Sequence, residues 1–134
     1  MIVKLVRITL IVRDQNEAFR FYTEKLGFEK RNDQPMGENT RWLTISLKDD
    51  HDLEIVLQPL NWFEGKVREE KAAQVGKNPT MVFRVDDCQK TYDLLRERGV
   101  IFEQSLQEKP YGIEALAKDL YGNTLDLLKI NSKL

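Results

Sequence analysis

The chain has 134 residues, a length typical of one domain that buries a substantial core. Its net charge is −1 and its basic and acidic residues are interleaved, which argues against binding to nucleic acid or an anionic membrane. Cys88 is the only cysteine, so a disulfide framework is excluded, a cytoplasmic location is favoured, and we expect Cys88 to pack as a small apolar residue. The apolar N-terminus is interrupted by Lys4 and Arg7, which is unlike a membrane span or a secretion signal.

The first half of the chain has the pattern of a strand, a helix and three further strands. Alternating apolar residues predict the first strand over residues 3–12. Asp14 and Glu17 have the spacing of a helix capping box, and Gly27 is placed to end the helix. A turn is expected over residues 33–40. The further strands of this first module, residues 1–59, are predicted at 29–31, 41–47 and 53–58.

A connector, residues 60–79, separates this module from the second half of the chain. It begins with Trp62 and Phe63 and continues as a charged run, in which we expect one or two short helical turns. Runs of this kind are usually solvated, so one interpretation is a surface linker. The other is a flap that places Trp62 or Phe63 over a pocket or a partner chain.

The second half repeats the order of the first. Val12 corresponds to Val85 at a spacing of 73 residues, and the helix-ending Gly27 corresponds to Gly99 at 72. A repeat that covers half of the chain indicates a duplicated module, with a site where the two copies meet. The elements predicted for module two, residues 80–134, are a helix at 87–98 and strands at 80–85, 100–103, 113–118 and 124–129.

These elements predict an α+β fold in which two tandem βαβββ modules form one domain over residues 1–134. Because each strand is apolar towards its helix, we expect a curved mixed sheet around a cleft, with the helices outside. The mixed faces then line the cleft, although a one-residue register error in a strand would replace all of its members. The residues predicted to line it are Arg7, Thr9, Trp42, Thr44, Ser46, Glu54, Val56, Gln58, Thr80, Val82, Arg84, Asp126 and Leu128.

Three motifs in this framework lie at residues 12–28, 83–100 and 118–127. In their order and duplicated spacing the chain resembles the vicinal oxygen chelate superfamily. That group includes glyoxalase I, extradiol dioxygenases, fosfomycin-resistance enzymes and bleomycin-binding proteins. The resemblance covers nearly the whole chain and implies the fold and a homodimer. It does not select one function, because the fold hosts several chemistries as well as non-catalytic binders.

The resemblance also implies where a metal would bind. In metal-dependent members the ligands come from the first and last strands of each module, which are the positions of Arg7, Thr80, Glu54 and Asp126. The first two positions usually carry His or Gln. Threonine is a weak ligand, and the fixed charge of Arg7 favours an ion pair with an acid in place of a metal ion. No metal or other cofactor is therefore expected, with Glu54 and Asp126 kept as weak candidate ligands of a divalent ion.

Other candidate residues have two interpretations each. Arg7 and Arg84 either clamp an anionic ligand or form salt bridges. Trp42 either stacks on a planar ligand or packs within the sheet. Tyr111 corresponds to a residue that borders the pocket in relatives, or is a turn aromatic. His51, the only histidine, lies in a charged turn and is expected at the surface.

Three functions are kept as hypotheses. The first is a small-molecule binder of the bleomycin-resistance type that works without a metal. The second is a lyase, isomerase or dioxygenase resembling glyoxalase I, in which Glu54 and Asp126 hold a divalent ion. The third is association with another protein through Trp62 and Phe63. The residues expected to bind a ligand are Arg7, Thr9, Trp42, Thr44, Glu54, Gln58, Thr80, Arg84, Tyr111 and Asp126.

Overall fold

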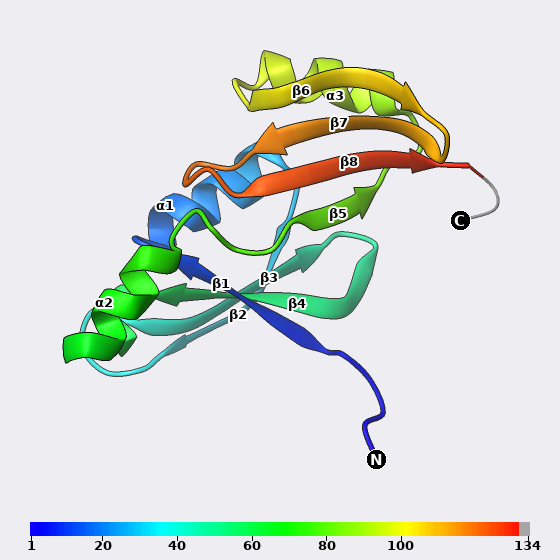
Figure 1. Cartoon of the computed structure of the whole chain (residues 1–134). Coiled ribbons are helices and arrows are strands. Elements are labelled where there is room, and N and C mark those ends of the chain that lie inside the picture. Colours follow the sequence, from blue (N-terminus) through cyan, green and yellow to red (C-terminus); the bar gives the residue numbers. More distant parts are fainter. Residues whose placement is uncertain (132–134) are drawn as a thin grey trace. The chain divides into compact units, whose positions relative to one another are not determined.

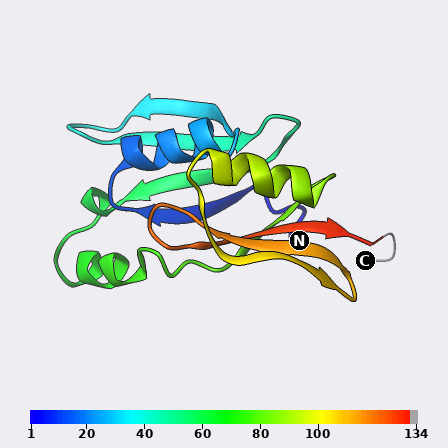
Figure 2. The ribbon, with the colours of Figure 1, turned by 90° about the horizontal axis from the view of Figure 1, so that it is seen from above.

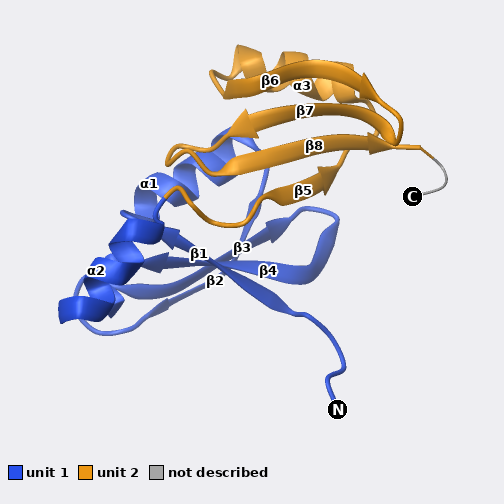
Figure 3. Cartoon of the chain, viewed as in Figure 1, with its two compact units in different colours: residues 1–75 blue, residues 76–134 orange. Residues whose placement is uncertain are grey.

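The computed structural model describes residues 1–131, which form two compact units divided between Val75 and Gly76 (Figure 3). Each unit contains one four-stranded mixed sheet and its own helices, and the two sheets have equivalent strand orders. The predicted α+β fold with duplicated βαβββ order is therefore confirmed. We describe the units separately as unit 1, residues 1–75, and unit 2, residues 76–131.

The sheet of unit 1 has the strand order β1-β4-β3-β2 (Figure 1). The parallel pairing of its first and last strands, β1 and β4, sets Arg7 beside Glu54 and Thr9 beside Val56. The other pairs, β4 with β3 and β3 with β2, are antiparallel. The strands are β1 (Arg7–Val12), β2 (Glu29–Pro35), β3 (Arg41–Leu47) and β4 (Asp50–Pro59).

Helix α1 (Gln15–Arg20) begins where the capping pattern predicted. The Asp14 carboxylate accepts a hydrogen bond of 2.9 Å from the backbone N–H of Glu17, and the helix packs on β4. A π-helical segment, Phe21–Lys25, continues it as far as Gly27, whose positive φ of 79° ends the helical path. The buried apolar residues of this face include Leu10, Val12, Ala18, Tyr22, Leu43, Ile45, Ile55 and Leu57.

The N-terminal strand is shorter than predicted. Its ladder with β4 starts where the Glu54 N–H donates to the Val6 carbonyl, and regular strand structure begins at Arg7. Upstream of this point Ile2 and Val3 each expose 94% of their surface. The alternation of residues 3–12 therefore predicts the faces of the strand correctly but not its length: β4 begins at Asp50, but β1 pairs with it only from Glu54 onward.

The connector contains the 3₁₀ turn η2 (Leu60–Trp62) and helix α2 (Gly65–Gln74). Helix α2 is longer than the one or two turns predicted, and none of its residues is buried. It contacts η2 and β1 of unit 1. Its solvated surface agrees with the charged composition of the segment.

The sheet of unit 2 has the order β5-β8-β7-β6, with β5 parallel to β8. Helix α3 (Cys88–Glu97) packs against β6, β7 and β8 (Figure 2), and its cap Asp87 accepts from the Lys90 N–H at 3.0 Å. The buried apolar side chains of this unit include Cys88, Leu95, Ala115, Ala117, Leu125 and Leu127. The strands are β5 (Met81–Arg84), β6 (Ile101–Lys109), β7 (Gly112–Lys118) and β8 (Thr124–Ile130).

Two details of unit 2 differ from the sequence predictions. The strand expected at residues 100–103 extends to Lys109, because its largely polar outer half still pairs with β7. The two consecutive leucines of α3 suggest a broad apolar stripe, but Leu94 exposes 42% of its surface, whereas the adjacent Leu95 is buried. One residue is about 100° on a helix, so the apolar stripe of α3 is narrower than its two consecutive leucines suggested.

Candidate functional site

The carboxylate of Glu54, on β4, is held by side chains from the three other strands of unit 1. Its Oε1 accepts hydrogen bonds from Asn32 Nδ2 at 2.8 Å and from Thr44 Oγ1 at 2.7 Å. Its Oε2 lies 3.4 Å from Arg7 Nε. The strand register explains this convergence, because Arg7 pairs with Glu54 across β1 and β4, and Asn32 pairs with Thr44 across β2 and β3.

These contacts stabilise the ionised form of Glu54. Its pKa is held below the ordinary value, chiefly by the Thr44 hydroxyl and further by Asn32 and Arg7, while burial acts in the opposite direction. The side chain of Glu54 is only 12% exposed, whereas that of Arg7 is 47% exposed. The acid is thus fixed in place, and the guanidinium beside it retains access to solvent.

Aromatic residues extend this arrangement. The rings of Trp42 and Trp62 are stacked, with centroids 6.1 Å apart and planes inclined by 9°, and Arg7 Cζ lies 5.9 Å from the Trp42 ring centroid. Trp62 is held by a hydrogen bond of 2.6 Å from its Nε1 to Thr40 Oγ1. The Arg7 guanidinium therefore contacts both an acid and an aromatic ring. We call the following residues the Glu54 cluster: Arg7, Asn32, Trp42, Thr44, Glu54 and Trp62.

The structure places six of the ten residues predicted to bind a ligand on one face of the unit 1 sheet. Four of them belong to the Glu54 cluster, and the register sets Thr9 and Gln58 on the same face. Thr9 is exposed and Gln58 partly exposed. Thr44 has no exposed surface, and its hydroxyl donates a hydrogen bond to Glu54. Thr44 therefore orients the acid and is not itself accessible to a ligand.

Unit 2 contains a different arrangement of acids. Asp126 on β8 and Glu114 on β7 are joined by a side-chain hydrogen bond, and the Tyr111 hydroxyl donates to Glu114 Oε1 at 2.9 Å. Burial, followed by the hydrogen bond and the charge of Glu114, raises the pKa of Asp126 to about 7. Asp126 Oδ1 is buried and has no hydrogen-bond partner among the described residues. The pair therefore holds a proton near neutral pH and retains one unused acceptor.

The remaining predicted residues, Thr80 and Arg84, lie at the two ends of β5. Thr80 is exposed and immediately precedes β5, and Arg84 is exposed at the end of β5. The residue of β5 that pairs directly with Asp126 is Val82, which exposes 58% of its surface. An apolar side chain thus occupies the position of unit 2 that Arg7 occupies beside Glu54 in unit 1.

The donor atoms near Glu54 do not fit a metal ion. Oε1 already accepts two hydrogen bonds, and Oε2 faces the permanently charged guanidinium of Arg7. Within residues 1–131, no three His, Cys, Asp or Glu side chains are grouped so that they could hold a metal ion. The ion pair predicted between Arg7 and an acid is present.

Three further residues considered in the sequence analysis lie outside both clusters. His51 is 44% exposed on its side chain and lies 3.5 Å from a Glu29 oxygen, which confirms a surface position. Cys88 is buried, its thiol contacts the Leu127 carbonyl, and burial raises its pKa, in agreement with the predicted apolar role. Phe63 lies under the Lys71 ammonium, 5.3 Å from its ring centroid.

Sequence reasoning missed Asn32, Trp62 and Glu114 as members of these clusters. Asn32 was outside the short strand predicted at residues 29–31, and the strand in fact continues to Pro35. The sequence predicts for Trp62 a place in a linker, a flap or a contact with a partner, and does not indicate its stacking on Trp42. Glu114 lies two residues from Leu116, which pairs with Asp126, and this register is set by the structure and not by the sequence pattern.

No helix in the described part of the chain is long and apolar enough to cross a membrane. Residues 4–127 match the sequence profile of the glyoxalase/bleomycin resistance protein/dioxygenase superfamily. Among curated proteins, YurT of Bacillus subtilis strain 168 is 38% identical over 127 residues, covering 94% of this chain and 98% of that protein.

Solved structures also match nearly the whole chain. UcmS2 is 37% identical with a TM-score of 0.85, covering 96% of this chain and 98% of that one. TnmS3 of Streptomyces sp. CB03234, described as an antibiotic binding protein, is 30% identical with a TM-score of 0.79, covering 97% and 98%.

Proposed function

Because the chain belongs to the glyoxalase/bleomycin resistance protein/dioxygenase superfamily, we propose that it binds a small molecule without using a metal ion. The observation that carries the proposal is the Glu54 cluster, in which the Arg7 guanidinium lies beside the acid that the family resemblance assigns to a metal. The description of the similar TnmS3 as an antibiotic binding protein supports binding as the activity. Its ligand is not carried over to this chain.

The chemistry of the cluster favours a planar ligand with an acceptor group. Trp42 and Trp62 are both partly exposed and offer aromatic surface, on which a conjugated ring system stacks well. The half-exposed Arg7 donates to a carbonyl or carboxylate of such a ligand without leaving Glu54. Glu54, fixed by Asn32 and Thr44, orients Arg7 and is a positioning residue.

The proposal keeps the other predicted ligand residues, which are Thr9, Gln58, Thr80, Arg84, Tyr111 and Asp126. It also includes a cytoplasmic homodimer, for which the family resemblance and the single cysteine are the support. Analytical ultracentrifugation at micromolar concentration tests the dimer, and a single species with the mass of one chain, 15.7 kDa, would contradict it.

A lyase or isomerase is the second candidate, and the acid pair of unit 2 favours it. A carboxyl whose pKa is about 7 is suited to moving a proton at physiological pH. Under this alternative Asp126 exchanges a proton with the substrate, and Glu114 and Tyr111 position it. Replacing Asp126 with Asn would then abolish turnover, whereas a pure binder would leave its ligand chemically unchanged.

The test combines metal analysis with a binding screen. Protein purified without chelator is analysed for nickel, zinc, iron and manganese, and a panel of planar aromatic natural products is screened by quenching of tryptophan fluorescence. We expect substoichiometric metal and saturable quenching that is lost in Trp42→Leu and retained in the control Phe63→Leu. A stoichiometric transition metal that disappears in Glu54→Gln would overturn the proposal.

A further inference from the structure

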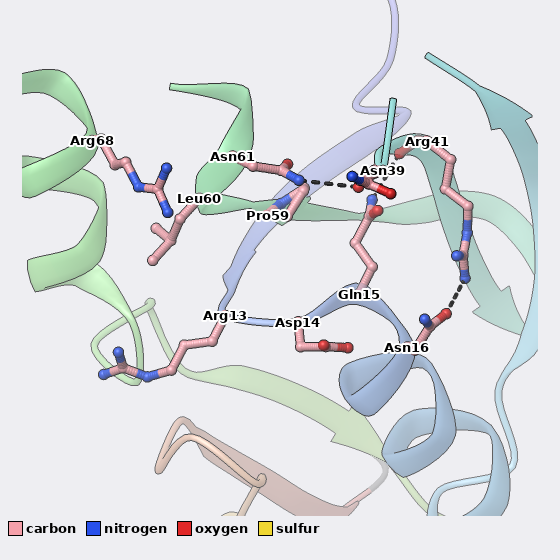
Figure 4. A pocket seen from close by; sticks show the side chains of 10 residues that line it. All are labelled: Arg13, Asp14, Gln15, Asn16, Asn39, Arg41, Pro59, Leu60, Asn61 and Arg68. Atoms are coloured by element: carbon pink, nitrogen blue, oxygen red, sulfur yellow. Dashed lines mark hydrogen bonds between the residues drawn. The ribbon is translucent and has the colours of Figure 1, made fainter. Parts of the chain in front are cut away.

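Unit 1 has a polar hollow that shares no residue with the Glu54 cluster. It has a volume of about 290 Å³ and lies where β1 and β4 end, bordered by η2 and α2 (Figure 4). This size is at the lower limit of ordinary small-ligand sites, roughly 300 Å³. The side chains that determine its charge and shape include Arg13, Asp14, Gln15, Leu60, Asn61 and Arg68.

Two arginines of this hollow, both exposed, have guanidinium groups without a hydrogen-bond or ion-pair partner within the described residues. Neither the Arg13 nor the Arg68 side chain makes a hydrogen bond or ion pair with any residue from 1 to 131. Arg41, at the other side of the hollow, is by contrast occupied: its Nε lies 3.0 Å from Asp33 Oδ1 and its Nη2 donates to Asn16 at 2.7 Å. Asp14 is the only acid among the lining residues, so positive charge is in excess.

The floor and rim of the hollow are held in place. Gln15 is 8% exposed, and its Nε2 donates to the carbonyls of Arg41 and Leu57 at 2.7 and 3.0 Å. Asn61 Nδ2 donates to the Asn39 carbonyl at 3.1 Å, which closes the rim (Figure 4). Figure 4 shows Arg13 and Arg68 on the side of the hollow opposite Gln15 and Arg41. A fixed polar wall facing two guanidinium groups suits a small polar anion better than an apolar ligand.

We propose that this hollow is a second binding site, which takes a small ligand through a carboxylate or phosphate held by Arg13 and Arg68. Guanidinium forks match the paired oxygens of both groups, and two forks around one concave site bind more strongly than an isolated surface arginine. An adjoining hollow of about 650 Å³ shares Gln15, Asn16, Asn39 and Arg41 with the first. Since Asp33 neutralises Arg41 there, this second space accommodates an uncharged polar part of the ligand.

Citrate and inorganic phosphate, titrated separately in low-salt buffer, are the probes. The reporter is the side-chain amide of Asn61 in a ¹H–¹⁵N NMR spectrum, because this group borders the hollow. We expect a saturable shift that weakens as salt is added, since screening reduces the attraction of exposed charges. Tighter binding of citrate assigns the site to carboxylates, and tighter binding of phosphate assigns it to phosphate esters.

Variants separate a built site from a general charge effect. The double variant Arg13→Gln, Arg68→Gln should weaken binding by about tenfold or more, since two charge-assisted contacts are lost. The double variant Arg13→Gln, Arg68→Lys should bind more tightly than Arg13→Gln, Arg68→Gln, because lysine restores the positive charge but not the paired donors of the guanidinium. The matched control is Arg20→Gln, which removes an arginine of α1 outside the hollow. Shifts that never saturate, or that change equally in the control and the double variant, would refute the site.

Discussion

Glu114 and Asp126 lie on neighbouring strands of unit 2 and are joined by a side-chain hydrogen bond. Burial of Asp126, followed by the hydrogen bond and the charge of Glu114, disfavours its ionised form, so Asp126 keeps its proton up to about pH 7. The Tyr111 hydroxyl occupies one oxygen of Glu114, which leaves Asp126 as the member that retains the proton. This proton links the pH of the solution to the stability of the fold.

Stability should therefore fall as the pH rises from about 4 towards 7. The folded pKa of Asp126, about 7, lies above the unfolded value of 3.8, so between these values the folded state binds more protons than the unfolded state. Its contribution is fully present below pH 4 and is lost by about pH 7. Allowing for solvent screening, we expect a loss of the order of 2 kcal/mol, measured by urea unfolding at pH 5 and pH 8.

Asp126→Asn should remove most of this pH dependence, because the amide cannot release a proton. Asp86→Asn, at an exposed position before α3, is the matched control and should retain the wild-type slope. Unfolding free energies of the wild type that are equal at the two pH values would contradict the proton retained by Asp126.

In unit 1, the hydroxyl of Thr44 should matter more for stability than the charge of Arg7. Thr44 is fully buried, and Thr44→Val leaves Glu54 Oε1 with one donor fewer, which should cost about 1–2 kcal/mol in unfolding free energy. Arg7→Gln removes a half-exposed ion pair and should cost less than about 1 kcal/mol. Chemical denaturation of both variants at pH 7 compares them, and a larger loss for Arg7→Gln would reverse this ranking.

Gly112, which follows the turn between β6 and β7, is expected to tolerate substitution poorly. Its φ is +155°, and an added Cβ would collide with the backbone carbonyl of Lys129 on β8. Because neither backbone moves cheaply within a paired ladder, Gly112→Ala should cost roughly 3 kcal/mol or more. Gly122→Ala has a comparable left-handed penalty at φ +93° but open space around its Cβ, so it should cost only about 1 kcal/mol. Thermal unfolding measures both, and equal losses would exclude the collision as the cause.

The sequence predicted the parts of the structure that depend on local pattern. Asp14 and Asp87 begin helices because their side chains accept from backbone N–H groups three residues on, a property of adjacent residues alone. Arg7 and Glu54 were placed on one face by alternation, and the register then set them side by side. The fold class could be predicted because the duplicated order leaves few compact arrangements.

The missing parts depend on contacts between distant segments. Strand β2 is mostly charged and polar, so it has no alternation of apolar residues from which its length could be predicted. The position of Asn32 on this strand could therefore not be predicted either. The Trp42–Trp62 stack joins residues of β3 and η2 whose proximity is set by the path of the chain after β4. The partners of Glu114 depend on the register of β7 against β8, which alternation does not specify.

Arg7→His tests whether Arg7 occupies the position of a metal ligand. The substitution replaces a fixed positive charge with a neutral imidazole that coordinates metals, beside a carboxylate already held in its ionised form. We expect the affinity for Ni²⁺, measured by isothermal titration calorimetry at pH 7.5, to rise by about tenfold over wild type. Binding should remain weak, because His and Glu54 supply two protein ligands where firm sites use three or more.

Two controls isolate the effect of Arg7→His. Adding Glu54→Gln to the variant should return the affinity to the wild-type level, because the second ligand is lost. Thr9→His places an imidazole on the same face two residues along β1, beside Val56 and not beside Glu54, and should bind Ni²⁺ no better than wild type. An affinity for Ni²⁺ that is unchanged by Arg7→His would show that the position beside Glu54 is not one from which a metal is bound, whichever side chain occupies it.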